Sequence, residues 1–314
     1  MALLNNLKPT AILKDLGFGN KDAERGGRFI NKDGTFNVKR KGAPFAATFS
    51  PFHYFITISW FRVLTIILTG YFAINTFFAV LYYWTGIEKL GGVDGETKVE
   101  KFLDAFFFSC QTFTTVGYGR INPLGITANF ISSLESLTGL LSFAIVTGIL
   151  YGRFARPNAS IIFSDNGIIA PYGDITAFEF KLANARTNQL IDVQVQVALS
   201  RIEGEPGKES RRYYELELER RTLDFFPTTW TVVHPIDENS PLYGYTKEEV
   251  DKSDAEFLIL FKAFDDKFAQ NIHTRNSYKY NELKWGVTFA TNFHRRKDGV
   301  TVLELDKMSD LKKN

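Results

Sequence analysis

The sequence predicts an α-helical membrane domain followed by an all-β domain of the immunoglobulin-like sandwich type. Two long stretches almost without charge, with a shorter charge-free stretch between them, are typical of two membrane spans flanking a re-entrant segment. From residue 153 onward, apolar and polar residues alternate, which is typical of strands with one buried face. We therefore divide the chain into an N-terminal segment (1–48), a membrane domain (49–152) and a β-domain (153–314).

The composition argues against several classes of protein. The chain has 37 Lys and Arg against 35 Asp and Glu, a net charge of +2, which does not suit a nucleic-acid-binding protein. Its one cysteine, Cys110, excludes a disulfide within the chain and a cysteine-based zinc site. The sequence contains no HExxH, GxSxG or Walker motif, so we expect neither an enzyme nor a bound cofactor.

The first span is predicted at Val63–Ile87, which carries no charge over a length sufficient to cross a bilayer. The second lies within Ile121–Gly152, where Glu135 is the only charged residue. A helix over residues 125–152 would be ~42 Å long, so it must tilt or protrude from the ~30 Å hydrocarbon layer.

Two spans place both termini on the same side of the membrane. Residues 1–62 contain ten Lys and Arg, whereas the connection 85–104 contains three, and this bias points the termini to the cytoplasm. Met1–Leu4 is followed by polar residues and not by an apolar run, so we expect no signal peptide.

A short helix is predicted just before the first span. Ser50 and Pro51 are typical of a helix N-terminus. Phe52, Ile56 and Trp60 then share one face of that helix, together with Phe55. An apolar face beside polar positions favours a helix that lies in the membrane surface.

The segment between the spans carries the clearest functional signal. Ala105–Gly119 is charge-free but too short to cross a membrane, and Phe102–Phe113 is predicted to be helical. The Thr-Val-Gly-Tyr-Gly segment that follows, residues 115–119, matches the filter motif of potassium channels, in which backbone carbonyls replace the hydration shell of K⁺. The predicted K⁺ ligands are Thr115, Val116, Gly117 and Tyr118, with Gly119 completing the filter.

One chain supplies only one strand of carbonyls, and a cage around an ion needs several. The filter therefore predicts a symmetric homotetramer with the filter on its axis. Potassium enters this prediction as the permeant ion and not as a cofactor.

Four separate segments resemble those of prokaryotic inward-rectifier-type potassium channels: Phe106–Gly119, Arg153–Pro157, His234–Tyr243 and Trp285–Gly286. The resemblance covers nearly the whole chain. It implies passive K⁺ conduction by a homotetramer in a bacterial inner membrane, a surface helix before the first span, and a gate where the second spans cross.

At 100° per residue, one stripe of the second span contains Leu140, Phe143, Thr147 and Tyr151. The resemblance assigns this stripe to the pore, with Phe143 and Thr147 in the cavity and Tyr151 at the gate. The alternative for Tyr151 is an aromatic residue at the membrane interface.

Glu135 is the only acid within the spans, and a central membrane charge costs about 3 kcal/mol on insertion scales. We expect Glu135 behind the filter, hydrogen-bonded to the region of the predicted helix Phe102–Phe113, where it would brace the filter. Gly139 and Gly148 are candidate bending points of the same helix.

In the β-domain, the resemblance aligns Asp192 with an acid that lines the cytoplasmic extension of the pore, and Glu282 is a weaker candidate. Such acids would concentrate cations. The alternative for both residues is an ordinary solvated strand face.

Arg62, Arg153 and Arg156 lie where the spans leave the membrane, and each basic group near an anionic leaflet is worth ~1 kcal/mol. The resemblance implies control by phosphoinositides or other anionic lipids. However, Asn158-Ala159 stands where many eukaryotic relatives carry a basic run. The alternative is ordinary contact of these side chains with headgroups.

Two other functions compete with a potassium channel. The chain could be a β-sandwich binding module whose two spans serve only as an anchor. It could also be a subunit of an active potassium transporter, which predicts assembly with different subunits.

Overall fold

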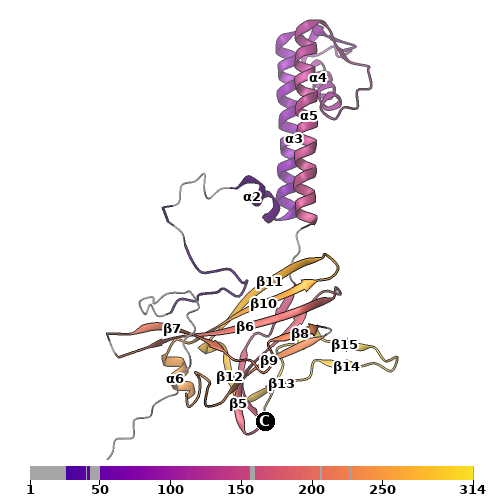
Figure 1. Ribbon diagram of the computed structural model, residues 1–314. Helices are drawn as coiled ribbons and strands as arrows, with labels where there is room; N and C mark the ends of the chain where they lie inside the picture. The colour runs from indigo at the N-terminus through magenta and orange to yellow at the C-terminus, as the bar shows by residue number, and fades with distance from the viewer. Residues whose placement is uncertain are drawn as a thin grey trace, which may run out of the picture. The chain divides into compact units, whose positions relative to one another are not determined.

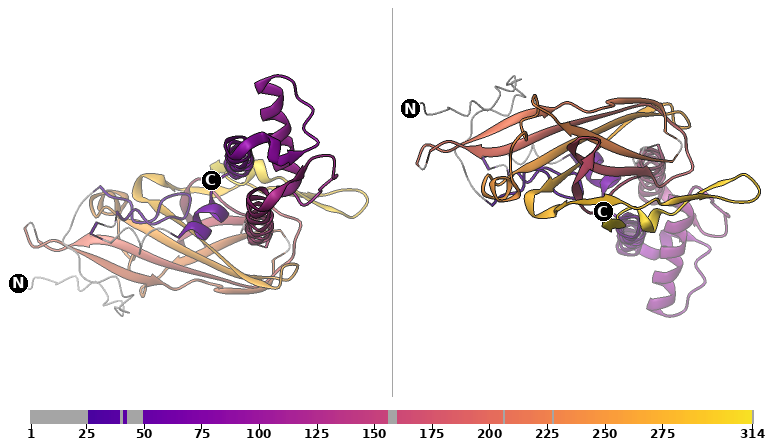
Figure 2. Two further views of the ribbon diagram at one scale, coloured as in Figure 1. Left: turned by 90° about the horizontal axis from the view of Figure 1, so that it is seen from above. Right: turned by 90° about the horizontal axis from the view of Figure 1, so that it is seen from below.

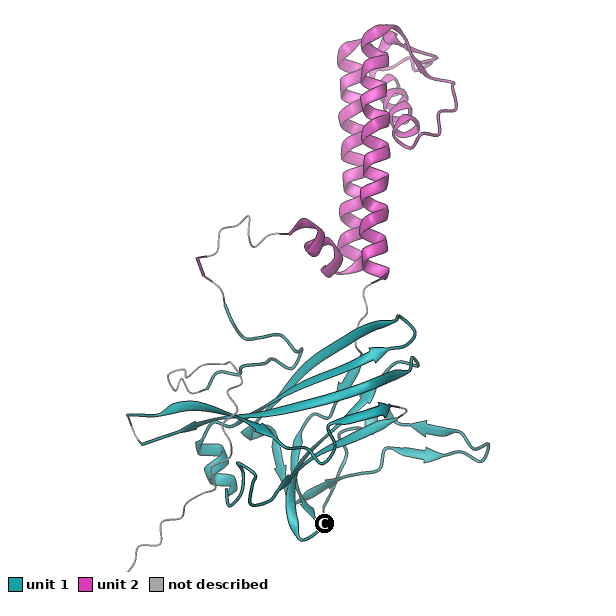
Figure 3. Ribbon diagram, in the orientation of Figure 1, with its two compact units in different colours: residues 1–40, 157–314 teal, residues 41–156 magenta. Residues whose placement is uncertain are grey.

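The structure is a computed structural model and describes residues 26–39, 41–42, 50–155, 160–205, 207–226 and 228–313. The chain divides into two compact units, residues 41–156 and residues 1–40 with 157–314 (Figure 3). Each unit has its own hydrophobic core. Of the predicted N-terminal segment, only residues 26–39 and 41–42 are described.

The unit formed by residues 41–156 is helical (Figure 1). Its helices are α2 (Pro51–Thr57), α3 (Trp60–Gly86), α4 (Lys98–Phe113) and α5 (Gly125–Phe154). Among the residues that the structure describes, two helices are long and apolar enough to cross a membrane, Trp60–Lys89 and Gly125–Phe154. The two predicted spans are therefore present as continuous helices.

The surface helix is shorter than predicted. Ser50 caps α2 by accepting a hydrogen bond from the backbone N–H of His53, and the helix ends at Thr57. Ile58 is extended, with φ −66° and ψ 163°, and Ser59 then caps α3. The prediction that Trp60 shares the apolar face of this helix was wrong, because the extended backbone at Ile58 separates the two helices.

Helix α4 begins at Lys98, earlier than the predicted start at Phe102. Thr97 and Glu100 form a capping box, in which each side chain accepts a hydrogen bond from the other residue's backbone N–H. Two short strands, β1 (Leu90–Gly91) and β2 (Asn122–Pro123), pair with each other and so join the chain before α4 to the chain before α5.

The other unit, the β-unit, is built on two five-stranded sheets. One sheet contains β6 (Leu190–Glu203), β7 (Ser210–Leu216), β8 (Thr222–Phe225), β10 (Glu256–Asp265) and β11 (Gln270–Lys279). The other contains β3 (Ile161–Phe163), β4 (Gly167–Tyr172), β5 (Ile175–Asn184), β9 (Thr229–Ile236) and β12 (Leu283–Trp285). Neighbouring strands are antiparallel, except that β12 runs parallel to β4.

The smaller elements of this unit lie at its margins. They are α6 (Lys247–Lys252), the pair β13 (Val287–Phe289) and β16 (Leu311–Lys313), and the hairpin β14 (Phe293–Arg295) and β15 (Thr301–Leu303). Figure 2 shows this hairpin extending beyond the two sheets.

The core of the β-unit lies between the sheets and follows the predicted alternation. Val193, Val195, Val197 and Leu199 of β6 are buried, as expected of every second residue of a strand. Aromatic rings dominate the centre, where the buried rings of Phe178 and Phe257 stack with centroids 4.1 Å apart. The prediction of a helical membrane domain followed by an all-β domain is confirmed.

Candidate functional site

The segment after α4 has an unusual backbone. Thr115, Gly117 and Gly119 have φ values of 60°, 54° and 82°, and the two residues between them do not have positive φ. Along residues 115–119, residues with a left-handed backbone therefore alternate with residues that do not have positive φ. Such alternation turns successive peptide groups so that their carbonyls can point to one side, as expected from the two glycines.

The end of α4 holds this segment in place. The backbone N–H groups of Val116 and Gly117 donate hydrogen bonds of 2.9 Å and 3.3 Å to the carbonyl oxygen of Gln111. The N–H of Thr115 donates to the carbonyl of Thr112 at 3.1 Å. The amide groups of the first three residues of the segment are thus bonded back to the helix, which leaves the carbonyls of these residues available for another partner.

Thr115 is the unexpected member of this alternation. The sequence suggested positive φ only at the glycines, because a β-branched residue in the left-handed region is strained. The bonds that its neighbours make to Gln111 compensate for this strain.

Arg120 and Asp104 fix the far end of the segment. The guanidinium of Arg120 donates to Oδ1 of Asp104 at 3.1 Å. The other oxygen of Asp104 accepts from the N–H groups of Asp94 and Gly95 at 3.2 Å and 3.0 Å. One acid on α4 therefore ties together the chain on both sides of that helix.

Glu135 lies fully buried among α3, α4 and α5. The hydroxyl of Tyr82 in α3 donates to Oε2 of Glu135 at 2.7 Å, and the hydroxyl of Ser109 in α4 bonds to Oε1. Ser109 also lies 3.1 Å from Oδ1 of Asn75 in α3. Glu135 thus contacts the helix that precedes the filter segment.

Sequence reasoning did not identify the partners of Glu135. Tyr82 and Ser109 are unremarkable residues of apolar helices. Asn75 did offer a signal, because it is the only amide side chain in Val63–Ile87. A lone amide in a membrane span requires a hydrogen-bonding partner.

The predicted pore stripe of α5 is exposed in the single chain. Leu140, Phe143 and Tyr151 are 60%, 73% and 75% exposed, and Thr147 is exposed as well. An apolar pocket of about 770 Å³ lies between α3 and α5, and Thr114, Thr115 and Phe143 are among its lining residues.

The predicted lipid-contact residues differ in their surroundings. Arg62 is exposed near the start of α3, whereas Arg153 is engaged at the end of α5. The Arg153 guanidinium donates a 2.5 Å bond to the carbonyl of Phe55 in α2 and lies 4.4 Å from the centroid of the Trp60 ring. Arg156 lies outside the described residues.

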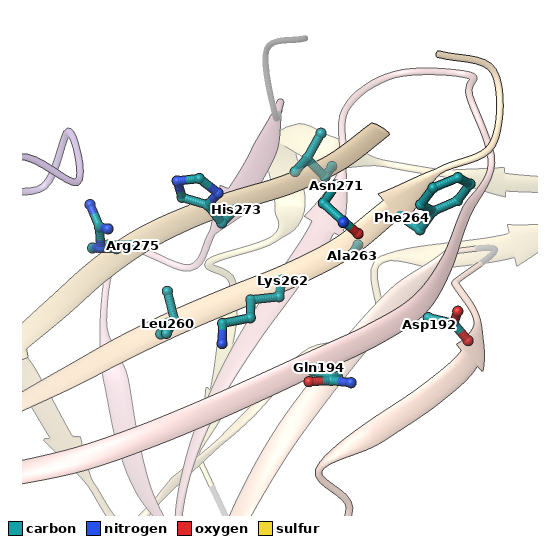
Figure 4. A pocket seen from close by; sticks show the side chains of 10 residues that line it. Asp192, Gln194, Leu260, Lys262, Ala263, Phe264, Asn271, His273 and Arg275 are labelled. Atoms are coloured by element: carbon teal, nitrogen blue, oxygen red, sulfur yellow. The ribbon is translucent and has the colours of Figure 1, made fainter. Parts of the chain in front are cut away.

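Asp192 lies on an exposed face of the sheet that contains β6. Its φ is 50°, next to an irregularity where the register between β6 and β10 shifts. It lines a pocket of about 620 Å³ together with Lys262, His273 and Arg275 (Figure 4). Lys262 and His273 are directly paired across β10 and β11. Asp192 is therefore the one acid among several basic side chains that line this pocket, a neighbourhood that its sequence position did not reveal.

Glu282 lies in a different environment from the one predicted. Its carboxylate bonds to the guanidinium of Arg28, lies 3.4 Å from Nζ of Lys32, and accepts a 2.8 Å bond from the N–H of Lys279. Two cations of the same chain therefore engage it. These contacts favour a role in holding residues 28–32 on the β-unit; that Glu282 also lines the cytoplasmic pore stays a prediction.

Two protein families match this chain. Residues 48–156 match the family described as ion channel, and residues 161–313 match the inward rectifier potassium channel C-terminal domain. Together the two matches span the helical unit and the β-unit.

Three relatives of this chain are inward rectifier potassium channels. The chain is 37% identical over 295 residues to inward rectifier potassium channel Kirbac3.1 of Paramagnetospirillum magnetotacticum, which covers 93% of this chain and 98% of that protein. It is 24% identical over 285 residues to inward rectifier potassium channel 18 of Homo sapiens and to ATP-sensitive inward rectifier potassium channel 12 of Bos taurus. Those two matches cover 83% of this chain, and 65% and 66% of the respective relatives.

Proposed function

The chain belongs to the inward rectifier potassium channel family, and from this membership we propose that it conducts K⁺ passively through a filter formed by Thr115–Gly119 of four identical chains. It is a membrane protein of an ion-channel family, which is not an enzymatic class. We place it in a bacterial inner membrane with both termini in the cytoplasm.

The observation that carries this proposal is the alternating backbone of the filter segment. Positive φ at Thr115, Gly117 and Gly119 allows carbonyls to face one side, while amide groups of Thr115, Val116 and Gly117 bond back to α4. Carbonyls of this kind replace the water around K⁺ in potassium channels. We propose K⁺ ligands from Thr115 to Tyr118.

Assembly into a homotetramer follows from the same segment, since one chain offers only one strand of carbonyls. The exposed stripe of α5 supports this assembly, because the described part of the chain leaves Phe143 and Tyr151 about three-quarters exposed. The pocket beside Thr115 is mainly apolar and offers a neighbouring helix a surface to pack on.

The proposed permeation path runs along the α5 stripe. Phe143 and Thr147 would line the cavity, and Tyr151 would form a constriction where four rings can close the path by bulk and by dewetting. Glu135 would act behind the filter as a support for α4. Asp192 would line the cytoplasmic vestibule, where the neighbouring Lys262 opposes its attraction for cations.

Anionic lipid is the proposed modulator at the membrane surface. Arg62 is exposed and available for a headgroup. The stacking of Arg153 on Trp60 and its bond to Phe55 indicate that it also braces α2 against α5. Lipid at Arg62 and at Arg156 would then act on the position of α2, and phosphoinositide is expected to inhibit.

The test is rubidium uptake into proteoliposomes that contain only the purified chain. We expect rubidium uptake driven by an outward K⁺ gradient, and block of that uptake by barium. Uptake of sodium should be small, and added phosphoinositide should reduce the uptake of rubidium. Gly117→Ala, which places a Cβ on a residue with φ 54°, should abolish selective uptake while the protein still inserts. An anchored binding module predicts no uptake, a transporter subunit predicts none without its partners, and equal passage of sodium would overturn the filter proposal.

A further inference from the structure

The buried cluster around Glu135 contains more acceptors than donors. The carboxylate is inaccessible to solvent, and none of the ion pairs among the described residues involves it. Two hydroxyl groups face it, that of Tyr82 at Oε2 and that of Ser109 at Oε1. A charged carboxylate here would lie in a protein interior without a cation, which is an unfavourable arrangement.

The position of the hydroxyl hydrogen of Ser109 decides whether every buried oxygen of the cluster has a donor. Ser109 has one hydroxyl hydrogen, and two oxygens lie within its reach, Oε1 of Glu135 and Oδ1 of Asn75 at 3.1 Å. The amide of Asn75 has a defined orientation, because its Nδ2 donates to the carbonyl of Tyr71 at 2.7 Å. Oδ1 of Asn75 therefore faces Ser109 as an acceptor.

If Glu135 were ionised, only one hydrogen, that of the Ser109 hydroxyl, would be available for two oxygens, Oε1 of Glu135 and Oδ1 of Asn75. The Ser109 hydroxyl would have to donate to the carboxylate, and Oδ1 of Asn75 would then face a lone pair inside a fully buried site. Buried acceptors without a donor are rare and costly.

A proton on Glu135 gives each of the facing oxygens, Oε1 of Glu135, Oγ of Ser109 and Oδ1 of Asn75, a hydrogen-bonding partner. We propose that Glu135 carries a proton at Oε1 and donates it in a hydrogen bond to Oγ of Ser109, which in turn donates to Oδ1 of Asn75. The Tyr82 hydroxyl donates to Oε2, and Asn75 donates onward to the Tyr71 carbonyl. The result is a directed chain of hydrogen bonds from α5 through α4 to α3.

This proton makes Glu135 a neutral positioning residue. Ser109 lies two residues before Gln111, whose carbonyl holds Val116 and Gly117. A neutral acid ties α4 in place without adding a fixed charge behind the filter. The protonation state of Glu135 is inferred from the contacts of the cluster alone. The effect of that protonation on conduction rests on the proposed function.

Infrared spectroscopy of the full chain in lipid tests the protonation state without measuring conduction. At neutral to mildly alkaline pH, we expect a carboxylic-acid C=O band that is absent from Glu135→Gln. Glu179→Gln is the matched control, because Glu179 is an acid of the β-unit whose pKa is raised by burial. The band should persist in the control. Absence of any such band from the native protein, or its persistence in Glu135→Gln, would overturn the proposal even if potassium flux is normal.

A double-mutant cycle between Ser109→Ala and Asn75→Leu tests the direction in which Ser109 donates its hydrogen bond. If Ser109 donates to Asn75, the loss of thermal stability in the double variant should be smaller than the sum of the two single losses. Additive losses would mean that Ser109 donates to an ionised Glu135, which contradicts the proposal.

Discussion

Gly139 of α5 packs directly against the backbone of Phe113, the last residue of α4. A Cβ at position 139 would lie 2.9 Å from the carbonyl carbon of Phe113, 3.1 Å from its Cα, and closer still to its oxygen. Gly139 therefore permits the close approach of two helices immediately before the filter segment. This contact gives the glycine a packing role, and its role as a bending point stays a prediction.

Gly139→Ala is expected to displace the end of α4 and to lower the selectivity for K⁺ over Na⁺. Overpacking of this kind costs about 1–3 kcal/mol, because backbone must move. The measurement is rubidium and sodium uptake before and after heating the proteoliposomes. Gly148→Ala is the control, since a Cβ there meets no atom of the described residues within 4 Å. Equal selectivity and equal heat resistance in the two variants would contradict the packing role.

Phe143→Asp is expected to strengthen voltage-dependent block by internal Mg²⁺. Phe143 is 73% exposed on the proposed pore stripe, and an apolar ring offers no electrostatic attraction to a divalent ion. Four carboxylates around the axis should lower the half-blocking concentration by at least about tenfold. Phe143→Asn, which has a similar size to aspartate but no charge, is the control. If both variants show the same block, Phe143 does not face the permeation path.

The long elements were predictable because their signals are local. The near-absence of charge over the width of a bilayer identified α3 and α5, and the period-two alternation of apolar and polar residues identified β6. The end of α2 was not predictable. Its apolar periodicity continues to Trp60, and only the extended backbone at Ile58 reveals the break.

The site was predictable only where one short segment carries the chemistry. The filter residues are contiguous, so their sequence identified them. The partners of Glu135 and Glu282 were not predictable, since Ser109 is 26 residues from Glu135 and Arg28 is 254 residues from Glu282. Such pairs arise from tertiary packing, which leaves no periodic pattern in the sequence.

The β-unit is expected to lose stability in mild acid because of His234. Burial lowers the pKa of this imidazole, whose Nδ1 bonds to the carbonyl of Glu217 at 2.5 Å and whose Nε2 bonds to Oγ of Ser240 at 2.8 Å. As the pH falls below about 6.5, the unfolded state binds a proton before the folded state does. The contribution of His234 is thus complete above that pH and is lost below it.

Thermal unfolding of the full chain, followed by circular dichroism at about pH 7.5 and about pH 5.5, measures this effect. His234→Gln should reduce the difference between the two pH values, whatever its absolute stability. His273→Gln, at an exposed histidine, should leave the difference intact. The assignment to His234 fails if the two variants respond to pH in the same way.

Lys262→Gln is expected to increase block by internal Mg²⁺, because Lys262 lines the same pocket as Asp192 and opposes its field. Removing one positive charge at roughly 8 Å in water changes the energy of a divalent ion by about 1 kcal/mol, or about fivefold in affinity. Asp192→Asn should have the opposite effect, and Lys284→Gln on the other sheet should have none. Currents across planar bilayers with Mg²⁺ on the cytoplasmic side provide the measurement. If Lys262→Gln and Lys284→Gln give the same half-blocking concentration, the face that carries Asp192 does not line the ion path, and the resemblance that assigned it there fails at this position.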